Sequence, residues 1–155
     1  MSDYLLAQKG IPPPYWAFAW SGGQALARFV LDHPDLVAGR CVLDIGSGSG
    51  IVAIAAAKAG AARMIANDID PFAHIAIELN AHANGISVES NNQTAINVPT
   101  TGINTIFAGD VCYELPFSTD DACWLKTTAQ NGIDVLIGNP DCTYLPKADL
   151  RPLAV

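Results

Sequence analysis

Three glycines, separated by single serines, follow a short apolar run in the first third of the chain. The run covers residues 41–45, and residues 46–50 read Gly-Ser-Gly-Ser-Gly. A helical pattern of small residues over 51–62 comes next, followed by a second apolar run over 64–66, within a strand expected over 63–67 that leads into Asp68. This order predicts a strand, a glycine turn, a helix and a second strand. Such a βαβ unit brings the glycine turn and the end of the second strand to the carboxyl edge of a parallel sheet, where open α/β sheets bind ligands.

The residue types at this edge suit a nucleoside that carries an anionic group. Gly46, Gly48 and Gly50 lack a Cβ atom, so the backbone can turn sharply and a ligand can approach it closely. The first turn of the helix after Gly50 presents N–H groups and a positive dipole end to an anion. Asp68, about 20 residues beyond the glycines, is placed to accept hydrogen bonds from two ribose hydroxyls. A dinucleotide would satisfy the same features, so the spacing of the glycines is needed to distinguish the two classes of ligand.

The spacing of the glycines disfavours a dinucleotide. The dinucleotide fingerprint is G-x-G-x-x-G, whereas residues 44–50 read D-x-G-x-G-x-G. Together with the acidic segment 67–71, this pattern resembles motif I of the class I S-adenosylmethionine-dependent methyltransferases. The resemblance implies S-adenosylmethionine as the cofactor and a doubly wound, mainly parallel α/β sheet of the Rossmann-like kind.

Composition and charge favour a single acidic domain over residues 1–155. Half of the residues are hydrophobic, and the formal charge of −7 comes from eight basic and 15 acidic residues. An acidic surface disfavours capture of nucleic acid, which needs clustered Lys and Arg. No apolar run approaches the ~18 residues of a membrane span. Neither nucleic acid nor a membrane is therefore an expected partner.

Cysteine usage and the amino terminus favour the reducing cytosol. The four cysteines form no C-x-x-C pair, so neither a metal site nor a disulfide framework is expected. The first residues lack the basic start and the cleavage site of a secretory signal. These observations predict a cytoplasmic location.

An aromatic segment closes the N-terminal strap, residues 1–20. Three prolines over 12–14 precede four aromatic residues within six positions, the last of which is Trp20. One interpretation is a strap that buries its aromatic rings on the domain surface. The other is that Trp16 or Trp20 forms a wall of the ligand pocket, because aromatic faces attract a sulfonium or an ammonium group.

Hydrophobic period and punctuation predict the remaining elements. Ser21 is expected to cap a helix over 22–32, and Asp70 with Pro71 to start a helix that ends near 84. The expected apolar face of the first helix is Ala25, Leu26, Phe29 and Val30. His74 and His82 are interpreted as ordinary surface or flank histidines. Further helices are expected over 121–129 and 147–153, and further strands over 87–90, 104–108 and 134–137.

Two polar residues follow the predicted fourth strand. Asp110 comes directly after its Ala-Gly end, and Tyr113 lies three residues further on. At that spacing both side chains can face one pocket beyond the strand. The alternative is a capped loop in which Tyr113 packs on the surface.

Four segments carry a more specific resemblance. Residues 13–26, 43–50, 66–71 and 109–113 resemble the electron transfer flavoprotein β-subunit lysine methyltransferases, a branch of the seven-β-strand class I methyltransferases. The resemblance implies a protein lysine N-methyltransferase whose substrate is electron transfer flavoprotein β-subunit.

The same resemblance implies a set of site residues. Asp44, Gly46 and Gly48 would hold the methionine part of the cofactor, Asp68 its ribose, and Trp20 would line the pocket. Asp110 and Tyr113 would lie where the lysine amine meets the methyl group, and they are the predicted catalytic residues. The full set of predicted cofactor-binding residues is Trp20, Asp44, Gly46, Ser47, Gly48, Gly50, Asp68 and Ile69.

The chain departs from this branch in two places, and other functions stay open. Residues 139–142 read Asn-Pro-Asp-Cys where the branch has Asp-Pro-Gly-Arg, and the sequence ends at Val155, where strands six and seven of the class would begin. The expected sheet therefore lacks these two strands. The alternatives are a methyltransferase for another protein, such as a ribosomal protein, or for a small amine, and an inactive cofactor-binding or interaction protein. A nucleobase amino-methyltransferase is disfavoured by the acidic charge.

Overall fold

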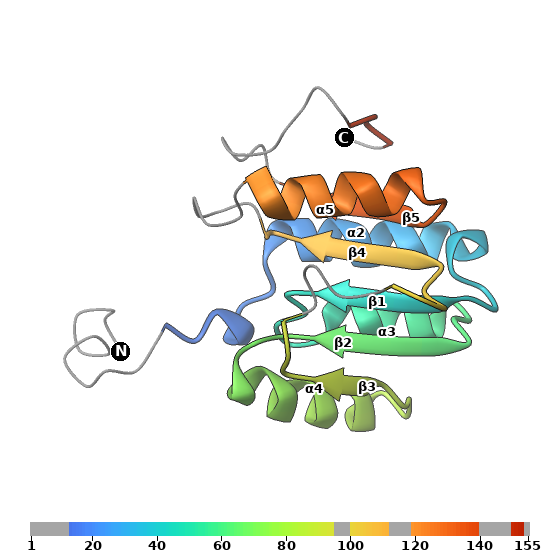
Figure 1. Cartoon of the computed structure of the whole chain (residues 1–155). Helices are drawn as coiled ribbons and strands as arrows, with labels where there is room; N and C mark the ends of the chain where they lie inside the picture. The colour runs from blue at the N-terminus through green and yellow to red at the C-terminus, as the bar shows by residue number, and fades with distance from the viewer. Residues whose placement is uncertain (1–12, 95–99, 112–118, 140–149, 154–155) are drawn as a thin grey trace.

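A five-stranded parallel sheet forms the centre of the computed structural model, which describes residues 13–94, 100–111, 119–139 and 150–153 (Figure 1). The sheet order is β3-β2-β1-β4-β5, and every neighbouring pair is parallel. This order confirms the predicted doubly wound α/β class. The strands are β1 (Cys41–Ile45), β2 (Arg63–Asn67), β3 (Glu89–Asn91), β4 (Thr105–Gly109) and β5 (Asp134–Gly138).

Strand β1 lies in the middle of the sheet and sets the position of the site. It pairs with β2 on one side and with β4 on the other, so that Asp44 lies opposite both Ala66 and Phe107. The chain runs outward from β1 to β2 and β3, then crosses back to β4. The carboxyl end of β1 is therefore the switch point of the sheet, the place where doubly wound folds bind ligands.

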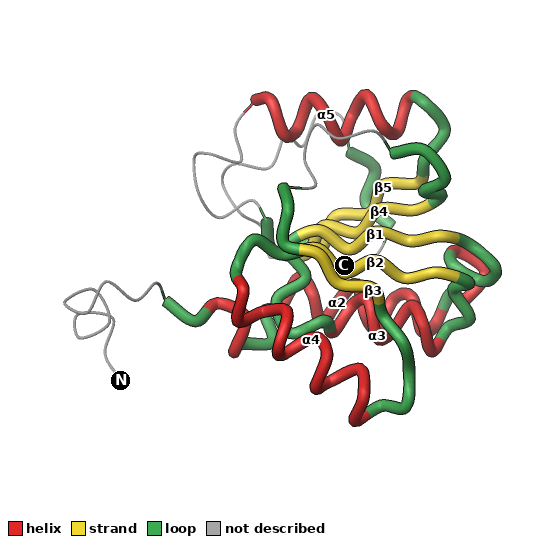
Figure 2. The backbone as a smooth tube through the Cα atoms, turned by 60° about the horizontal axis from the view of Figure 1, so that its bottom comes forward, coloured by secondary structure: helices red, strands yellow, loops and turns green. Residues whose placement is uncertain are grey.

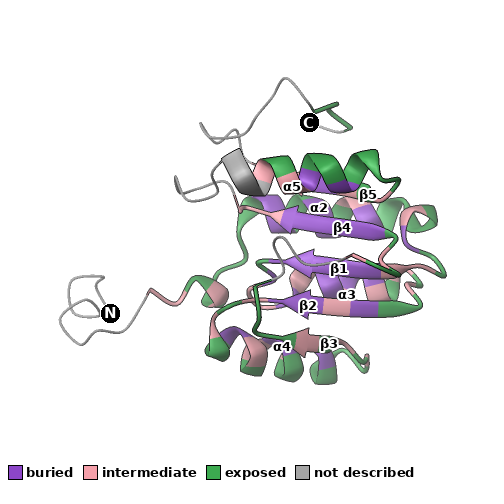
Figure 3. Cartoon of the chain, in the orientation of Figure 1, coloured by how far each residue is buried: buried purple, intermediate pink, exposed green. Residues whose placement is uncertain are grey.

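Helices cover both faces of the sheet (Figure 2). Helices α2 (Ser21–Asp32), α3 (Ile51–Lys58) and α4 (Pro71–Ala83) lie on one face, and α5 (Thr119–Gln130) lies on the other. Two cores result, one around Val30, Ala53 and Ile77 and one around Ile106 and Leu125. Strands β1 and β4 are buried over most of their length (Figure 3). No helix among the described residues is both long enough and apolar enough to cross a bilayer.

Most predicted elements are present, with local differences at their ends. The helix predicted over 51–62 ends at Lys58, because the chain turns at Gly60 with a φ of +96°. Strand β3, predicted over 87–90, is shifted towards the polar residue Asn91. A helix is predicted over 147–153, of which the structure describes residues 150–153. These residues are not helical, so this part of the prediction is wrong.

The start of α2 differs from the prediction in two respects. Ser21 is the first helical residue rather than the cap, and Trp20 holds the cap position without a side-chain capping bond. Ala25 is exposed, whereas Ala27 is buried against the core. The predicted apolar face was therefore wrong in one residue, since it included Ala25 in place of Ala27. The period of Leu26 and Val30 is compatible with either alanine.

Glycine pairs allow α2 to contact the sheet backbone directly. A Cβ atom added to Gly138 would lie 2.2 Å from the carbonyl oxygen of Gly22, and one added to Gly22 would lie 2.3 Å from that of Gly138. A Cβ atom on Gly109 would lie 3.0 Å from the Cα of Gly23. The absence of these atoms lets the first turn of α2 lie against the ends of β4 and β5.

Candidate functional site

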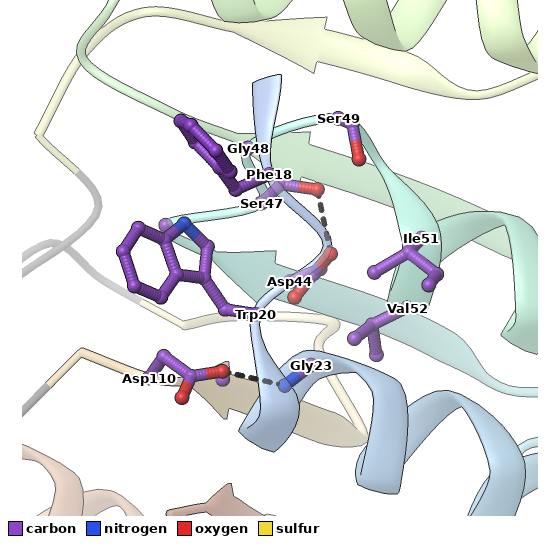
Figure 4. A pocket seen from close by; sticks show the side chains of 12 residues that line it. Phe18, Trp20, Gly23, Asp44, Ser47, Gly48, Ser49, Ile51, Val52 and Asp110 are labelled. Atoms are coloured by element: carbon purple, nitrogen blue, oxygen red, sulfur yellow. Dashed lines mark hydrogen bonds between the residues drawn. The ribbon is translucent and has the colours of Figure 1, made fainter. Parts of the chain in front are cut away.

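A cleft lies at the carboxyl edge of the sheet, where β1 and β4 end beside the first turn of α2 (Figure 4). It contains about 330 Å³ of empty space, part of which is open to solvent. The aromatic segment, the first turn of α2, the glycine loop with the start of α3, and the end of β4 contribute to its walls. The lining residues are Phe18, Trp20, Gly23, Asp44, Gly46, Ser47, Gly48, Ser49, Ile51, Val52, Gly109 and Asp110.

The glycine loop turns with a backbone that only glycine adopts readily. Gly46, Gly48 and Gly50 have φ angles of +62°, +57° and +84°, in the left-handed region that a side chain disfavours. Gly46 and Gly48 line the cleft, whereas Gly50 faces α4. The missing side chains therefore expose loop backbone to the cleft.

Asp44 is a buried carboxylate at the base of the cleft. Its side-chain oxygen Oδ2 accepts hydrogen bonds from the hydroxyl of Ser47 at 2.6 Å and from the backbone amide of Ala53 at 3.2 Å. Burial raises the pKa of Asp44 to about 7; the bonds from Ser47 and Ala53 lower the pKa, and the charge of Asp68 raises it. Ala53 is the third residue of α3, so Asp44 acts as the cap that Gly50 cannot supply.

This capping bond changes the expectation for the start of α3. The sequence predicts backbone N–H groups that face a bound anion there. The amide of Ala53 instead donates to Asp44, so part of the helix N-terminus is occupied by a side chain of the protein.

Asp68 follows β2 and joins the glycine loop. Its Oδ2 accepts a hydrogen bond from the amide of Gly48 at 2.8 Å, and its Oδ1 accepts one from the amide of Asp70 at 3.0 Å. Asp68 does not line the cleft but contacts Gly48, which does. A carboxylate has about four acceptor positions, so Asp68 can still accept bonds from sugar hydroxyls. The next residue, Ile69, is 76% exposed and lies outside the cleft lining.

Two aromatic rings form the open side of the cleft. Trp20 is 47% exposed, and its indole N–H donates to the carbonyl oxygen of Tyr15 at 2.9 Å. The rings of Trp20 and Phe18 lie 5.8 Å apart and tilted. Of the two tryptophans considered from the sequence, Trp20 lines the cleft. Both rings are exposed, so they are not buried on the domain surface as the strap interpretation expects.

Asp110 lies across the cleft from the glycine loop, with a φ of +54°. Its Oδ2 accepts a hydrogen bond from the amide of Gly23 at 2.7 Å (Figure 4). Its own amide donates to the carbonyl oxygen of Gly138. The second carboxylate oxygen, Oδ1, makes no hydrogen bond to the described residues. Asp110 thus caps α2, the role that the sequence assigned to Ser21, through one of its two carboxylate oxygens.

The structure brings most of the predicted site residues together. Asp44, Ser47, Trp20 and Asp110 line one cleft with Gly46 and Gly48, Gly50 and Asp68 adjoin it, and Ile69 lies further out. Tyr113 and residues 140–144 lie outside the described residues. The lining residues that sequence reasoning missed include Phe18, Gly23 and Gly109. The adjacent glycines at 22 and 23, at the start of a predicted helix, were the available signal for a close contact.

Comparison with known proteins places this geometry among methyltransferases. The family model described as ribosomal protein L11 methyltransferase (PrmA) matches residues 25–111. The electron transfer flavoprotein beta subunit lysine methyltransferase of Danio rerio is 44% identical over 142 residues, which cover 90% of this chain and 55% of that protein. The ribosomal protein L11 methyltransferase of Edwardsiella ictaluri is 60% identical over 63 residues, 41% of this chain and 21% of that protein.

A solved structure supports the fold. An RNA methyltransferase from Salinibacter ruber, in complex with S-adenosyl-L-homocysteine, matches with a TM-score of 0.56 and 21% identity over 73% of each chain. The chain spans about half the length of the flavoprotein-methylating relatives that it matches.

Proposed function

The chain belongs to the ribosomal protein L11 methyltransferase (PrmA) family, and from this premise we propose that it transfers a methyl group from S-adenosylmethionine to a lysine of a protein. The observation that carries the proposal is the bond between Gly48 and Asp68. It joins the glycine loop, at a residue without a side chain, to a carboxylate at the end of the neighbouring strand, beside a cleft at the switch point of the sheet.

The residues of the cleft fit this cofactor, which supplies a methyl group on a positively charged sulfur. Asp68 would accept hydrogen bonds from the ribose hydroxyls through its remaining acceptor positions. Gly46 and Gly48 would let the methionine part approach the backbone. Trp20 offers an aromatic face to a cation, and the exposed Ile69 offers an apolar surface to the base.

Asp110 is the proposed contact for the lysine. Its Oδ2 is held by the amide of Gly23, and its Oδ1 makes no bond to the described residues. In this proposal Oδ1 binds the incoming ammonium group and helps it lose a proton. A fixed carboxylate also aligns the amine, and such positioning supplies much of the rate in a transfer between two bound groups. Tyr113 stays a proposed second contact.

The proposed protein substrate is electron transfer flavoprotein β-subunit. The proposal rests on relatives that match most of this chain and carry that substrate in their names. A second candidate is ribosomal protein L11, which the family model and the 60% identical segment favour.

A labelling assay separates these substrates. The chain is incubated with tritium-labelled S-adenosylmethionine and either purified electron transfer flavoprotein or ribosomal protein L11, and lysine labelling is measured. Label in the flavoprotein β-subunit supports the first proposal, and label in the ribosomal protein alone supports the second. The absence of label in both, with measurable S-adenosylhomocysteine binding, would overturn both substrate assignments.

Calorimetry tests the cofactor site itself. Asp68→Ala should abolish binding of S-adenosylhomocysteine, whereas Asp35→Ala should leave it unchanged. Asp35 is an exposed aspartate before β1, on the opposite edge of the sheet. No binding by the wild-type chain would overturn the proposed function.

A further inference from the structure

Helix α4 contacts the glycine loop through a side-chain amide. The Nδ2 of Asn80 donates to the carbonyl oxygen of Ser49 at 2.8 Å. One turn earlier, α4 lies close to the next residue of the loop, since a Cβ atom added to Gly50 would lie 3.4 Å from Cγ1 and 3.6 Å from Cα of Ile77. Ile77 is fully buried. The glycine loop is therefore bonded to α4 at Ser49 and lies close to it at Gly50.

The same helix contacts the acidic loop through a histidine. The Nε2 of His74 lies 2.9 Å from the carbonyl oxygen of Asp68. A carbonyl oxygen only accepts hydrogen bonds, so Nε2 carries the proton and donates it. His74 is therefore a partly buried residue on the flank of α4 that bonds loop backbone.

A third bond connects the two loops to each other. The Oδ2 of Asp68 accepts from the amide of Gly48. His74, Ile77 and Asn80 are spaced three residues apart, the spacing of neighbours on a helix surface. The helix, the glycine loop and the acidic loop (residues 68–70) are thus each bonded to the other two. Side chains of α4 donate to one backbone carbonyl oxygen of each loop.

We propose that His74 and Asn80 are positioning residues that hold the two cofactor-binding loops at the separation the nucleoside requires. The inference rests on the proposed function, because it assigns these residues to the same site. Both side chains bond loop backbone, so they act through Ser49 and Asp68 rather than by contact with the ligand. Removing either donor removes one bond between α4 and a loop, and neither side chain belongs to the buried core.

Three substitutions of the two donor side chains test the proposal. Asn80→Asp keeps the side-chain shape but replaces the donor with a carboxylate oxygen that repels the Ser49 carbonyl. His74→Asn places its amide too close to the helix to reach Asp68, whereas His74→Gln carries an amide at about the reach of Nε2. We expect Asn80→Asp and His74→Asn to weaken S-adenosylhomocysteine binding about fivefold to tenfold, the effect of losing one or two such bonds. His74→Gln should restore the affinity to within about twofold.

Matched controls come from the same helix. Asn84→Asp introduces the same charge at the C-terminal end of α4, where the side chain of Asn84 donates to the carbonyl oxygen of Asn80 and not to a residue of the glycine loop. His82→Asn changes an exposed histidine two turns beyond His74. Both controls should bind S-adenosylhomocysteine with wild-type affinity.

Amide hydrogen exchange of the unliganded chain gives a readout independent of binding. Asn80→Asp should raise exchange over residues 46–50, and His74→Asn over 68–70, while exchange in β1 and β4 stays low. If the wild-type chain fails to bind, the proposed function fails, and the exchange data still test the contacts. If the wild-type chain binds and both variants match it in affinity, the inference is overturned. A lowered melting temperature with unchanged affinity would also overturn it, because it would show a purely structural role. Should Asn80→Asp not fold, the two histidine variants decide.

Discussion

The side chain of Asp110 accepts a hydrogen bond from the backbone amide of Gly23 at 2.7 Å, and so caps α2 from the end of β4. Asp44 makes the equivalent bond to Ala53 at the start of α3. Neither helix begins at a residue whose own side chain forms a capping bond. Both carboxylates line the cleft, so the groups that hold its walls in place are also groups that a ligand would meet.

The capping role of Asp110 can be separated from its charge. Asp110→Ala should lower the free energy of unfolding by about 1–2 kcal/mol, the usual loss for a helix cap, because the amide of Gly23 loses its acceptor. Asp110→Asn keeps an acceptor oxygen and tolerates the positive φ, so its cost should stay under about 0.5 kcal/mol. Urea denaturation measures both values. Equal stability of the two variants would show that the bond contributes nothing to α2.

Neighbouring glycines of α2 should respond in opposite directions to alanine. A Cβ atom at Gly22 would lie 2.3 Å from the carbonyl oxygen of Gly138, so Gly22→Ala should destabilise the chain by about 1–3 kcal/mol through overpacking. At Gly23 the nearest atom would be 3.5 Å away. Gly23→Ala should therefore be neutral or stabilise the chain by up to about 1 kcal/mol through helix propensity. Thermal unfolding gives the comparison, and a loss of stability in both variants would contradict the packing described for α2.

The raised pKa of Asp44 predicts a pH-dependent stability. Its pKa is about 7 in the folded chain and 3.8 as the ordinary value, so the folded state binds more protons between these limits. Stability should therefore fall as the pH rises from about 4 to 7, by at most about 1.4 kcal/mol per pH unit, and level off above 7. Asp44→Asn should flatten this slope. Denaturation at several pH values tests it, and identical slopes for the wild type and the variant would exclude Asp44 as the cause.

Trp20 should matter for binding more than for stability. Its ring is 47% exposed, so Trp20→Ala should change the free energy of unfolding by less than about 1 kcal/mol. If the ring contacts the cofactor, the same change should weaken S-adenosylhomocysteine binding about tenfold, while Trp20→Phe keeps an aromatic face and loses less. Calorimetry on both variants checks this. Wild-type affinity of Trp20→Ala would remove Trp20 from the site.

Sequence reasoning succeeded where the signal was local. The apolar runs and glycine turn around β1 gave the first βαβ unit, and Asp70 caps α4 as predicted, with its side chain accepting from the amide of Phe72. It failed for the cap of α2, because the capping group comes from another strand and depends on the sheet order. The third strand was placed imprecisely, since β3 is a short polar edge strand without an apolar period.

The contacts between α4 and the two loops also could not be predicted from the sequence. The bonds that His74 and Asn80 make to loop carbonyls depend on how α4 packs against the sheet, and nothing in their spacing distinguishes them from surface residues. The convergence of Asp44, Asp68 and Asp110 at one edge followed from parallel strand order, whereas their individual hydrogen bonds did not.

The two capping bonds differ greatly in the length of chain they enclose. The bond from Ala53 to Asp44 spans nine residues, whereas the bond from Gly23 to Asp110 spans 87. Closing a longer loop costs more chain entropy, and distant contacts form later in folding. We therefore expect the glycine loop with α3 to assemble early as a local unit, and the α2 wall to become ordered only once β4 has docked. Before β4 has docked, the chain would therefore have the glycine-loop wall of the cleft without the α2 wall.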